Sequence, residues 1–244
     1  MKANLTRSSG ASFLRIRTFA VLSAAVLLLV PCLASPAAQA QKSVSLPEEI
    51  EWTWEVRPPH PDSSLPNVLL LGDSITRNYF PEVTKDLAGT ANVYLMASST
   101  CVGDPRLPSQ IAEFDQMEHV SFQVVHFNNG MHGWGYSDAE YARYFEELPA
   151  AIRAASLHAK LIWASTTPVR KDQPGGATNA RIEARNAIAA RAIGPSIPID
   201  DQYALMTGHG DLHSDDVHFS AEGSALQAAQ VVDSILKLLV ISPK

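Results

Sequence analysis

The fold is constrained first by a run of four apolar residues, Val68 to Leu71, which ends at Gly72. Unbroken apolar character predicts a strand buried on both faces, as the strands of parallel sheets are. Gly72 allows a sharp turn, and Asp73 and Ser74 follow at once. In open α/β sheets the ligand crevice lies outside the carboxyl ends of the strands. Ser74 therefore occupies a position suited to a reactive side chain, although Asp73 and Ser74 could also serve only as a helix cap.

Beyond this strand, apolar runs alternate with helical patterns. We expect strands at 68–71, 93–96, 122–127, 161–165 and 197–199, and helices at 79–87, 108–117, 137–155, 181–192 and 221–240, the third kinked at Pro149. Strands separated by helices predict crossover connections and a parallel sheet. The sequence therefore predicts an α/β protein. Its expected architecture is a three-layer α/β/α sandwich with a five-stranded, mostly parallel, flavodoxin-like sheet.

The first 40 residues differ in kind from the rest. They contain four cationic residues and no acidic one, then an apolar stretch at 19–33, then the small-residue pattern Ala38-x-Ala40. This order predicts a secretory signal peptide at 1–40. The apolar stretch is shorter than the about 20 residues of a membrane span. We therefore expect export to the periplasm or secretion, with no stable membrane insertion after cleavage; a retained anchor and a lipid-modified Cys32 are weaker alternatives.

Charge and cysteine content narrow the function further. Removal of the four cationic residues of the signal takes the formal net charge from −6 to −10. An acidic protein is poorly suited to nucleic acid or to anionic membranes. Cys101 is the only cysteine left after cleavage, so no intramolecular disulfide is expected. We expect no nucleic-acid partner and a fold held by its core alone.

The remaining chain is expected to contain an extended N-terminal lead-in at 41–66 and one domain at 67–244. The lead-in contains Trp52 and Trp54, which we expect to pack on the domain surface. It lacks a clear helical or strand pattern, and it is rich in proline near its end.

Acids and histidines gather in the loop at 211–220, just before the last helix. Asp215 and Asp216 precede His218 there. A serine hydroxyl is a weak nucleophile until a base accepts its proton, and that base works best when a third group fixes its tautomer. His218 can accept the proton, and Asp215 or Asp216 can orient the ring. A solvated turn is the alternative reading of this loop, and a metal site built from alternating ligands is a weaker one.

Four blocks follow successive strands or precede the last helix, in one order along the chain. They are Gly72-Asp73-Ser74, Gly103, Asn128, and Asp215 or Asp216 with His218. This set resembles the SGNH (GDSL-type) hydrolase family over about residues 67–240. The resemblance implies an SGNH hydrolase fold and a catalytic domain at 67–244. It also implies that Ser74 attacks an ester carbonyl and His218 accepts its proton. The oxyanion would be held by the N–H groups of Ser74 and Gly103 and by the Asn128 side chain, without metal or cofactor.

The chain departs from the family pattern at three places. Its third block reads Phe-Asn-Asn-Gly-Met-His, at 127–132, instead of Gly-x-Asn-Asp, which favours Asn128 over Asn129 as the oxyanion ligand. Gly103 is the only glycine in the second block, so Cys101 or Val102 could present the amide instead. The spacing Asp-x-x-His favours Asp215 but leaves Asp216 open.

Asp73, Asn129, His132 and Trp134 are expected to line the substrate site. We expect a small-molecule or carbohydrate ester as substrate. Carbohydrate O-acetyl groups are the first to consider, because the chain is exported and acidic and has aromatic side chains, Trp134 and Tyr136, in this loop. The alternatives are a lipase, thioesterase or acyltransferase with the same residues, a non-catalytic carbohydrate-binding relative, and a metal-dependent phosphoesterase.

Overall fold

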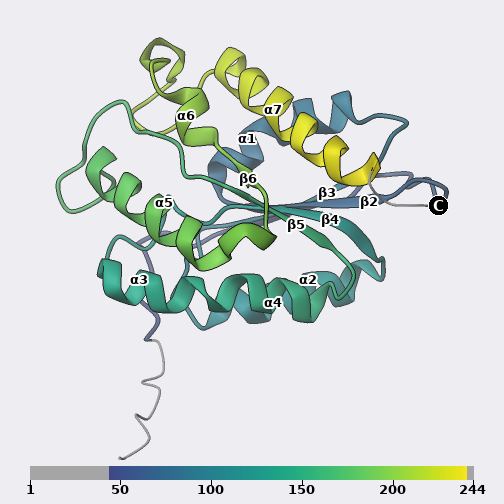
Figure 1. Cartoon of the computed structure of the whole chain (residues 1–244), viewed down its shortest axis with the longest axis horizontal. Coiled ribbons are helices and arrows are strands. Elements are labelled where there is room, and N and C mark those ends of the chain that lie inside the picture. The colour runs from purple at the N-terminus through teal and green to yellow at the C-terminus, as the bar shows by residue number, and fades with distance from the viewer. Residues whose placement is uncertain (1–43, 241–244) are drawn as a thin grey trace, which may run out of the picture. The chain divides into compact units, whose positions relative to one another are not determined.

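A computed structural model describes residues 44–240 and shows one sheet between two layers of helices (Figure 1). The strands are β1 (Thr53–Val56), β2 (Asn67–Gly72), β3 (Asn92–Ser98), β4 (Phe122–Phe127), β5 (Lys160–Ala164) and β6 (Ile199–Asp200). The α-helices are α1 (Ser74–Asp86), α2 (Arg106–Glu118), α3 (Asp138–Phe145), α4 (Glu147–Ala155), α5 (Asn179–Ile193), α6 (Gln202–Met206) and α7 (Ala221–Val240). The three-layer α/β sandwich expected from the sequence is confirmed.

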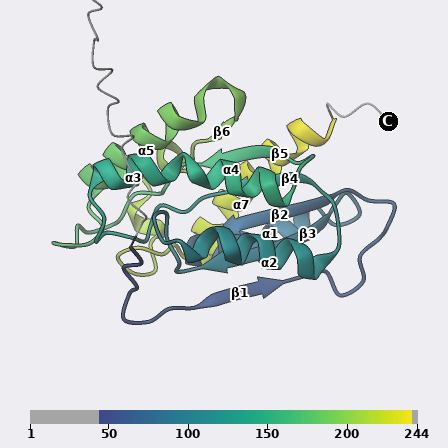
Figure 2. The same ribbon diagram turned by 90° about the horizontal axis from the view of Figure 1, so that it is seen from below.

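The sheet has the order β1-β3-β2-β4-β5-β6, and every pair except β1–β3 is parallel. Without β1, the five parallel strands follow the flavodoxin-like order 2-1-3-4-5. The prediction of five strands was wrong by one, because β1 lies in the segment read as an extended lead-in. β1 pairs antiparallel with β3 at the edge of the sheet, where Figure 2 shows it, and three of its four residues are exposed. An exposed edge strand needs no apolar run, so its sequence gave no signal.

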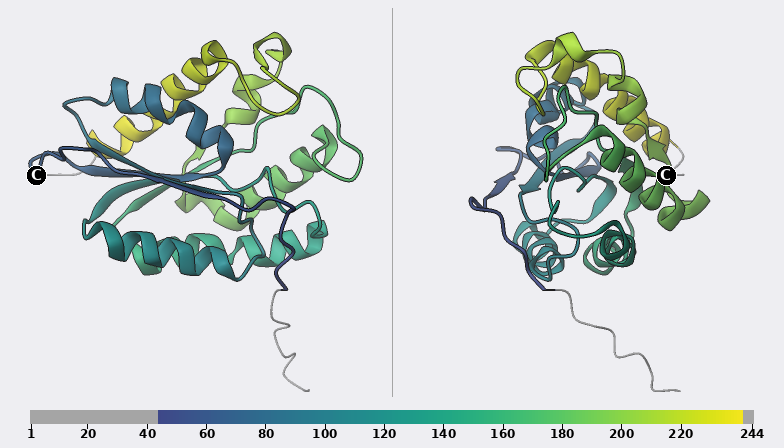
Figure 3. Two further views of the ribbon diagram at one scale, coloured as in Figure 1. Left: turned by 180° about the vertical axis from the view of Figure 1, so that it is seen from behind. Right: turned by 90° about the vertical axis from the view of Figure 1, so that its left-hand side faces the viewer.

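The two faces of the sheet are covered by different helices, as the edge-on view in Figure 3 shows. Helices α1 and α7 pack on one face over Val68, Leu70 and Val124. Helices α2 to α5 cover the other face over Leu69, Val125 and Trp163. Successive residues of β2 and β4 thus contribute to opposite cores, which is why these strands are mostly apolar.

Some helix boundaries differ from those expected. Helix α1 begins at Ser74 instead of residue 79, because the Asp73 side chain accepts a hydrogen bond from the Ile75 N–H and caps it. The expected helix at 137–155 begins with the predicted capping box of Ser137 and Glu140, but it divides into α3 and α4 at Glu146 instead of bending at Pro149.

The sheet brings the ends of β2 and β4 together. Leu71 is in register with Phe127, and the Asn128 N–H donates to the Leu71 carbonyl at 2.9 Å. This is the point where the order of the parallel strands reverses, and it is where crevices open in doubly wound sheets. The loops after β2 and β4, with Ser74 and Asn128, therefore start side by side.

The predicted signal peptide at 1–40 and the first residues of the lead-in lie outside the described residues. Between residues 44 and 240, none of the helices has the length and apolar character that a membrane crossing requires.

Candidate active site

Ser74 is the first residue of α1, directly after the buried strand β2. A side chain at Gly72 would overlap the Thr76 hydroxyl and crowd the Asn128 carbonyl, so only glycine fits this turn. Asp73 is 1% exposed and caps the helix through one carboxylate oxygen. The capping interpretation therefore holds for Asp73, while the Ser74 hydroxyl is directed elsewhere.

Ser74, His218 and Asp215 form a continuous hydrogen-bonded chain. Ser74 Oγ lies 2.8 Å from His218 Nε2, across 144 residues of sequence. His218 Nδ1 lies 2.8 Å from Asp215 Oδ2. A carboxylate accepts only, so Nδ1 carries the proton and Nε2 presents a lone pair to the serine hydroxyl. This is the tautomer that a general base beside a serine requires.

The carboxylate of Asp215 is held by its own loop. Its Oδ1 accepts the backbone N–H groups of Val217 and His218, each at 2.7 Å. Burial acts to raise the pKa of Asp215, but donation from the His218 and Val217 N–H groups and from the His218 ring outweighs it and lowers the pKa to about 2. Asp215 is therefore ionised at neutral pH.

Asp216, the other predicted partner of His218, binds a different group. Its Oδ1 accepts from the Arg170 guanidinium at 3.0 Å, and its backbone carbonyl accepts the Arg170 N–H at 2.9 Å. Two adjacent carboxylates thus have separate contacts. Asp215 orients the imidazole, and Asp216 ties the loop to the segment after β5.

The two asparagines after β4 also have separate contacts. Asn128 Nδ2 donates to the Ala164 carbonyl at 2.7 Å and to Thr166 Oγ1 at 3.3 Å. Asn129 Oδ1 accepts the Val102 N–H at 2.6 Å, and its Nδ2 donates to the Thr100 carbonyl at 2.9 Å. Asn128 thus uses both amide hydrogens to reach the end of β5, whereas Asn129 uses one and fastens the loop after β3.

The loop after β3 contains Gly103 and the two alternatives to it, Cys101 and Val102. The Val102 N–H is already bound to Asn129. Gly103 has φ +100°, and a side chain there would collide with the rings of Tyr136 and Tyr144. Its glycine identity thus follows from backbone conformation and close packing. Burial raises the pKa of the Cys101 thiol to about 12, which keeps it protonated and unreactive.

His132 is fixed by the N-terminal segment. Its Nδ1 lies 2.9 Å from Glu48 Oε1, and its ring meets Trp52 edge to face. Burial acts to lower the pKa of His132, but Glu48, and then Asp73, outweigh it and raise the pKa. Its Nε2 and Asp73 Oδ2 are both buried without a hydrogen-bond partner among the described residues. Glu48 could not be predicted as a partner of His132, because a contact across 84 residues leaves no local pattern.

Trp134 is held in place by two arginines of α5. The Arg185 and Arg181 guanidiniums lie 4.4 Å and 5.0 Å from the centre of its ring, and the indole N–H donates to the Met131 carbonyl. Arg185 is 1% exposed and also donates to the carbonyls of Gly133 and Tyr136. The Trp134 side chain thus fastens the 131–136 loop to α5, and the sequence reasoning missed Arg185.

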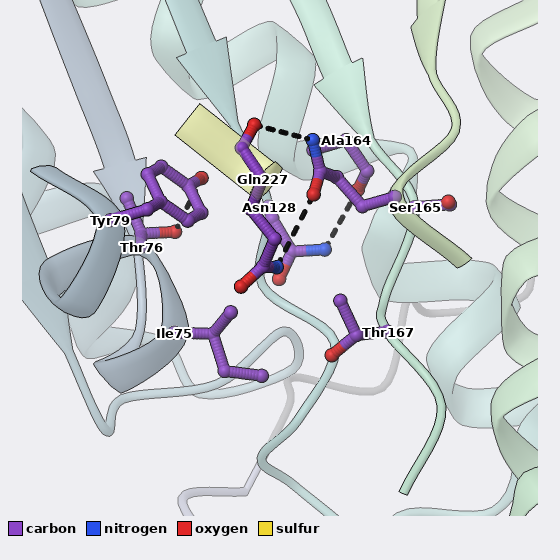
Figure 4. A pocket seen from close by; sticks show the side chains of 9 residues that line it. Ile75, Thr76, Tyr79, Asn128, Ala164, Ser165, Thr167 and Gln227 are labelled. Carbon is purple, nitrogen blue, oxygen red and sulfur yellow. Dashed lines mark hydrogen bonds between the residues drawn. The ribbon is translucent and has the colours of Figure 1, made fainter. Parts of the chain in front are cut away.

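A small cavity lies behind Asn128, between α1 and the ends of β4 and β5 (Figure 4). Its volume is about 10 Å³, enough for about one water molecule and too small for a substrate. Thr76 and Tyr79 line it, and the Tyr79 hydroxyl donates to Thr76 Oγ1 at 3.1 Å. Within residues 44–240, no three His, Cys, Asp or Glu side chains are arranged to hold a metal ion.

His126, which the sequence placed in the third predicted strand, belongs to the core. Its Nε2 lies 2.8 Å from Asp200 Oδ2, and both side chains are 0% exposed. The pair lies inside the sheet region, on β4 and β6, and forms no part of the Ser74 group.

No family model and no curated protein matches the sequence. Solved structures do match the fold. A protein from Slackia heliotrinireducens assigned as an SGNH hydrolase has 23% identity and a TM-score of 0.56, covering 70% of this chain and 99% of its own. The lipase/acylhydrolase from Enterococcus faecalis has 19% identity and a TM-score of 0.57, over 74% and 99%. A carbohydrate esterase of family 3 from Talaromyces cellulolyticus has 18% identity and a TM-score of 0.56, over 73% and 100%. The chain therefore has the SGNH hydrolase fold.

Proposed function

We propose, starting from this fold, that the chain is a serine hydrolase that cleaves carboxylic esters. The observation that supports the proposal is the relay from Ser74 Oγ to His218 Nε2 and from His218 Nδ1 to Asp215, with both distances 2.8 Å. In a hydrolase of this kind, nucleophile, base and orienting carboxylate must lie within hydrogen-bond reach of one another. Two of the three groups come from one loop before α7, and the third comes from the opposite end of the domain sequence.

The reaction proceeds in two halves. Ser74 Oγ attacks the ester carbonyl carbon while its proton passes to His218 Nε2, and the carbon–oxygen bond to the alcohol then breaks as that proton passes to the leaving oxygen. Water then attacks the acyl-serine, gives its proton to His218 and releases a carboxylic acid and free Ser74. A positioned base of this kind contributes about 10²–10⁴ in rate.

The negative charge of the tetrahedral intermediate develops beside the start of α1. The backbone N–H of Ser74 belongs to the first turn of that helix, where unpaired N–H groups and the helix dipole favour an anion. We assign the other oxyanion donors to the Gly103 N–H and an asparagine side chain. Asn128 is the residue favoured by the sequence, while Asn129 retains one amide hydrogen outside its bond to Thr100.

The proposed substrate is a carbohydrate carrying O-acetyl groups, acted on outside the cytoplasm. The cationic, apolar and small-residue order of residues 1–40 supports export. Among the proteins with similar folds are the family 3 carbohydrate esterase and an acetyl xylan esterase with 14% identity and a TM-score of 0.54. The acidic mature chain suits a neutral substrate and argues against nucleic acid as a partner.

The test is covalent labelling combined with a panel of esters. We expect a fluorophosphonate probe to label the wild type, and Ser74→Ala to lose both labelling and hydrolysis of p-nitrophenyl acetate. Ser121→Ala is the matched control, because Ser121 is exposed and lies just before β4, at the opposite end of that strand from Asn128. Wild-type activity in Ser74→Ala would refute the proposed nucleophile. A preference for long-chain over acetyl esters would replace the deacetylase assignment with a lipase.

A further inference from the structure

A hollow lies beside the segment that leads into the loop of Asp215 and His218, and His213 of that segment lines it. It has a volume of about 370 Å³ and lies between α5, α6 and the segment that follows β5. Arg170, in its wall, donates to both the carbonyl and the carboxylate of Asp216. The hollow and the Ser74 group therefore share one hydrogen-bonded loop. Its size falls in the range of small-molecule sites, about 300–1,000 Å³.

The charged groups of this wall balance one another. Arg170 contributes one positive charge and Glu183 one negative charge. Arg170 is paired with Asp216, and Glu183 accepts a hydrogen bond of 2.6 Å from the Tyr203 hydroxyl. A ligand with a net charge would gain little here, because each charge already has a partner. The wall therefore suits a neutral ligand.

His213 contributes a mostly buried ring to the wall, packed against Phe219. Its Nε2 lies 3.3 Å from the Pro168 carbonyl, which can only accept, so Nε2 carries the proton. The Nδ1 lone pair then has no partner among the described residues, in a ring that is 9% exposed. The ring thus helps to form the base of the hollow, and the ligand's hydrogen bonds are assigned to the other polar groups of the wall.

The hollow is lined by both apolar and polar side chains. The Tyr203 ring, Met206 and Val169 provide apolar contact, and Thr207 and Glu183 provide hydrogen-bonding groups. Asn179 stiffens the wall, because its side-chain amide binds both the N–H and the carbonyl of Val169. Sugar rings have apolar faces and a rim of hydroxyl groups, so this mixed lining matches a pyranose or furanose ring.

A smaller hollow of about 280 Å³ adjoins the first. The two share Glu183 and Tyr203, whose hydrogen bond forms the ridge between them. Trp163 and Ile199 line the second hollow. Two adjacent hollows with a common wall suit a ligand of more than one ring.

We propose that these hollows form a second binding site, for a neutral oligosaccharide, on α5 and α6 beside the catalytic loop. The site deepens the proposed function and rests on it. It holds sugar units that flank the unit whose ester reaches Ser74. Its chemistry is hydrogen bonding and ring contact only, with no covalent step.

The test measures binding of unacetylated oligosaccharides from xylan, mannan and glucan to the wild-type protein by isothermal titration calorimetry. We expect at least one of them to bind with a Kd of about 1 mM or below. Glu183→Trp places a large ring at the ridge and should raise that Kd about tenfold or more. Thr207→Trp, at an exposed position on the other side of the first hollow, should do the same. Glu113→Trp on α2 is the matched control and should bind like the wild type.

Two outcomes overturn the site. One is the absence of binding by every oligosaccharide at about 10 mM, and the other is equal affinity in the wild type, Glu183→Trp and Thr207→Trp. Circular dichroism verifies that each variant is folded. The failure of this site and the failure of the hydrolase are distinguishable. Labelling at Ser74 without sugar binding would refute only the proposed sugar site, whereas sugar binding without labelling would refute the proposed hydrolase.

Discussion

At the residue scale, Asp215 and Asp216 are adjacent carboxylates with different partners. Asp215 Oδ2 contacts the imidazole of His218, and Asp216 Oδ1 contacts the exposed guanidinium of Arg170. The first bond fixes the tautomer on which the proposed proton transfer depends. The second is a surface ion pair, a class that contributes about 0–1 kcal/mol. The same change to each residue should therefore have unequal effects.

We predict that Asp215→Asn lowers kcat/KM for p-nitrophenyl acetate by about 10²–10⁴, because an amide at 215 no longer holds the proton on His218 Nδ1. Asp216→Asn should stay within about threefold of the wild type. Steady-state kinetics at one pH, above the pKa of about 2 of Asp215, makes the comparison. Equal losses in the two variants would contradict the assignment of Asp215.

At the element scale, α5 holds the 131–136 loop through Arg185. This buried side chain donates to the carbonyls of Gly133 and Tyr136 and contacts the rings of Trp134 and Tyr141. Asp138, its charged partner on α3, lies 3.6 Å away. Burial lowers the pKa of the Arg185 guanidinium. The acceptor carbonyls and the aromatic rings around it stabilise its positive charge.

We predict that Arg185→Met lowers the free energy of unfolding by about 1.5–3 kcal/mol, because it removes the charge-assisted hydrogen bonds to the carbonyls of Gly133 and Tyr136, which retain only the Tyr136 N–H and the Arg181 guanidinium as donors. Arg191→Met is the matched control on the same helix, where the side chain is exposed, and should change stability by about 0.5 kcal/mol or less. Urea unfolding followed by circular dichroism measures both. A loss in Arg185→Met no larger than that of the control would show that α5 does not support the loop.

The N-terminal segment is a second element that supports the same loop. Tyr136 donates from its hydroxyl to the Val44 carbonyl, and Glu48 pairs with His132. The hydrogen bond to His132 lowers the pKa of Glu48, and the pKa of His132 is raised in turn. The stability that Glu48 contributes is therefore lost as the pH falls through its folded pKa. The contribution of His132 is lost as the pH rises through its own.

We predict that the Tm difference between wild type and Glu48→Gln is largest between these two pKa values and shrinks on either side. Differential scanning calorimetry across pH measures this. Glu49→Gln, an exposed neighbour, is the control and should show no such maximum. A difference that is constant from acid to alkaline pH would mean that the pair contributes no linked ionisation.

The elements that sequence could predict are those with a local signal. Apolar runs located β2 to β5 to within a residue or two, and Ser137 with Glu140 located the start of α3. Strand β1 was not predicted because it is an exposed antiparallel edge strand. Helix α6 was not predicted because five residues are too few to show a helical period. The observed helix boundaries differ from the predicted ones where a side chain determines them. The Asp73 cap, for example, starts α1 five residues before the predicted start.

The residues of the candidate site can likewise be separated into those with a local sequence signal and those without one. Ser74, Asp215 and His218 could be predicted, because each follows a strand or precedes a helix at the same sheet edge. Glu48 and Arg185 could not, because their partners lie 84 and about 50 residues away and no spacing rule links them. Which of the two carboxylates, Asp215 or Asp216, contacts His218 is visible only in the structure, since both side chains fit the sequence pattern.

At the scale of the whole molecule, strand order determines where the site can form. β2 is central and has β3 and β4 as parallel neighbours, so the loops after all three leave the same edge of the sheet. The loop before α7 reaches this edge because α7 packs against α1, which begins at Ser74. The Ser74–His218 contact is thus a consequence of how these two helices pair on one face.

A buried polar network holds β4, β6, α6 and α7 together behind the site. Asp200 accepts from His126 at 2.8 Å, from Gln202 at 3.0 Å and from Gln230 at 2.7 Å. Burial acts to raise the pKa of Asp200, but the hydrogen bond and charge of His126, and the two glutamines, outweigh it and lower the pKa. A carboxylate with a lowered folded pKa stabilises the fold above its unfolded pKa, about 3.9, and loses that contribution as the pH falls through the folded value.

We predict that Asp200→Asn lowers the free energy of unfolding by about 3 kcal/mol at neutral pH, because it leaves His126 beside an uncharged amide in a fully buried site. The deficit should narrow as the pH falls from about 4 towards the lowered folded pKa of Asp200, since the unfolded wild-type chain takes up a proton there that the folded carboxylate resists, whereas asparagine does not titrate. Urea unfolding at neutral and acid pH measures both values. Asp233→Asn, exposed on α7, is the control and should show no deficit of this size. A deficit in Asp200→Asn that stays the same at every pH would mean that the network depends on side-chain shape and not on the charge of Asp200.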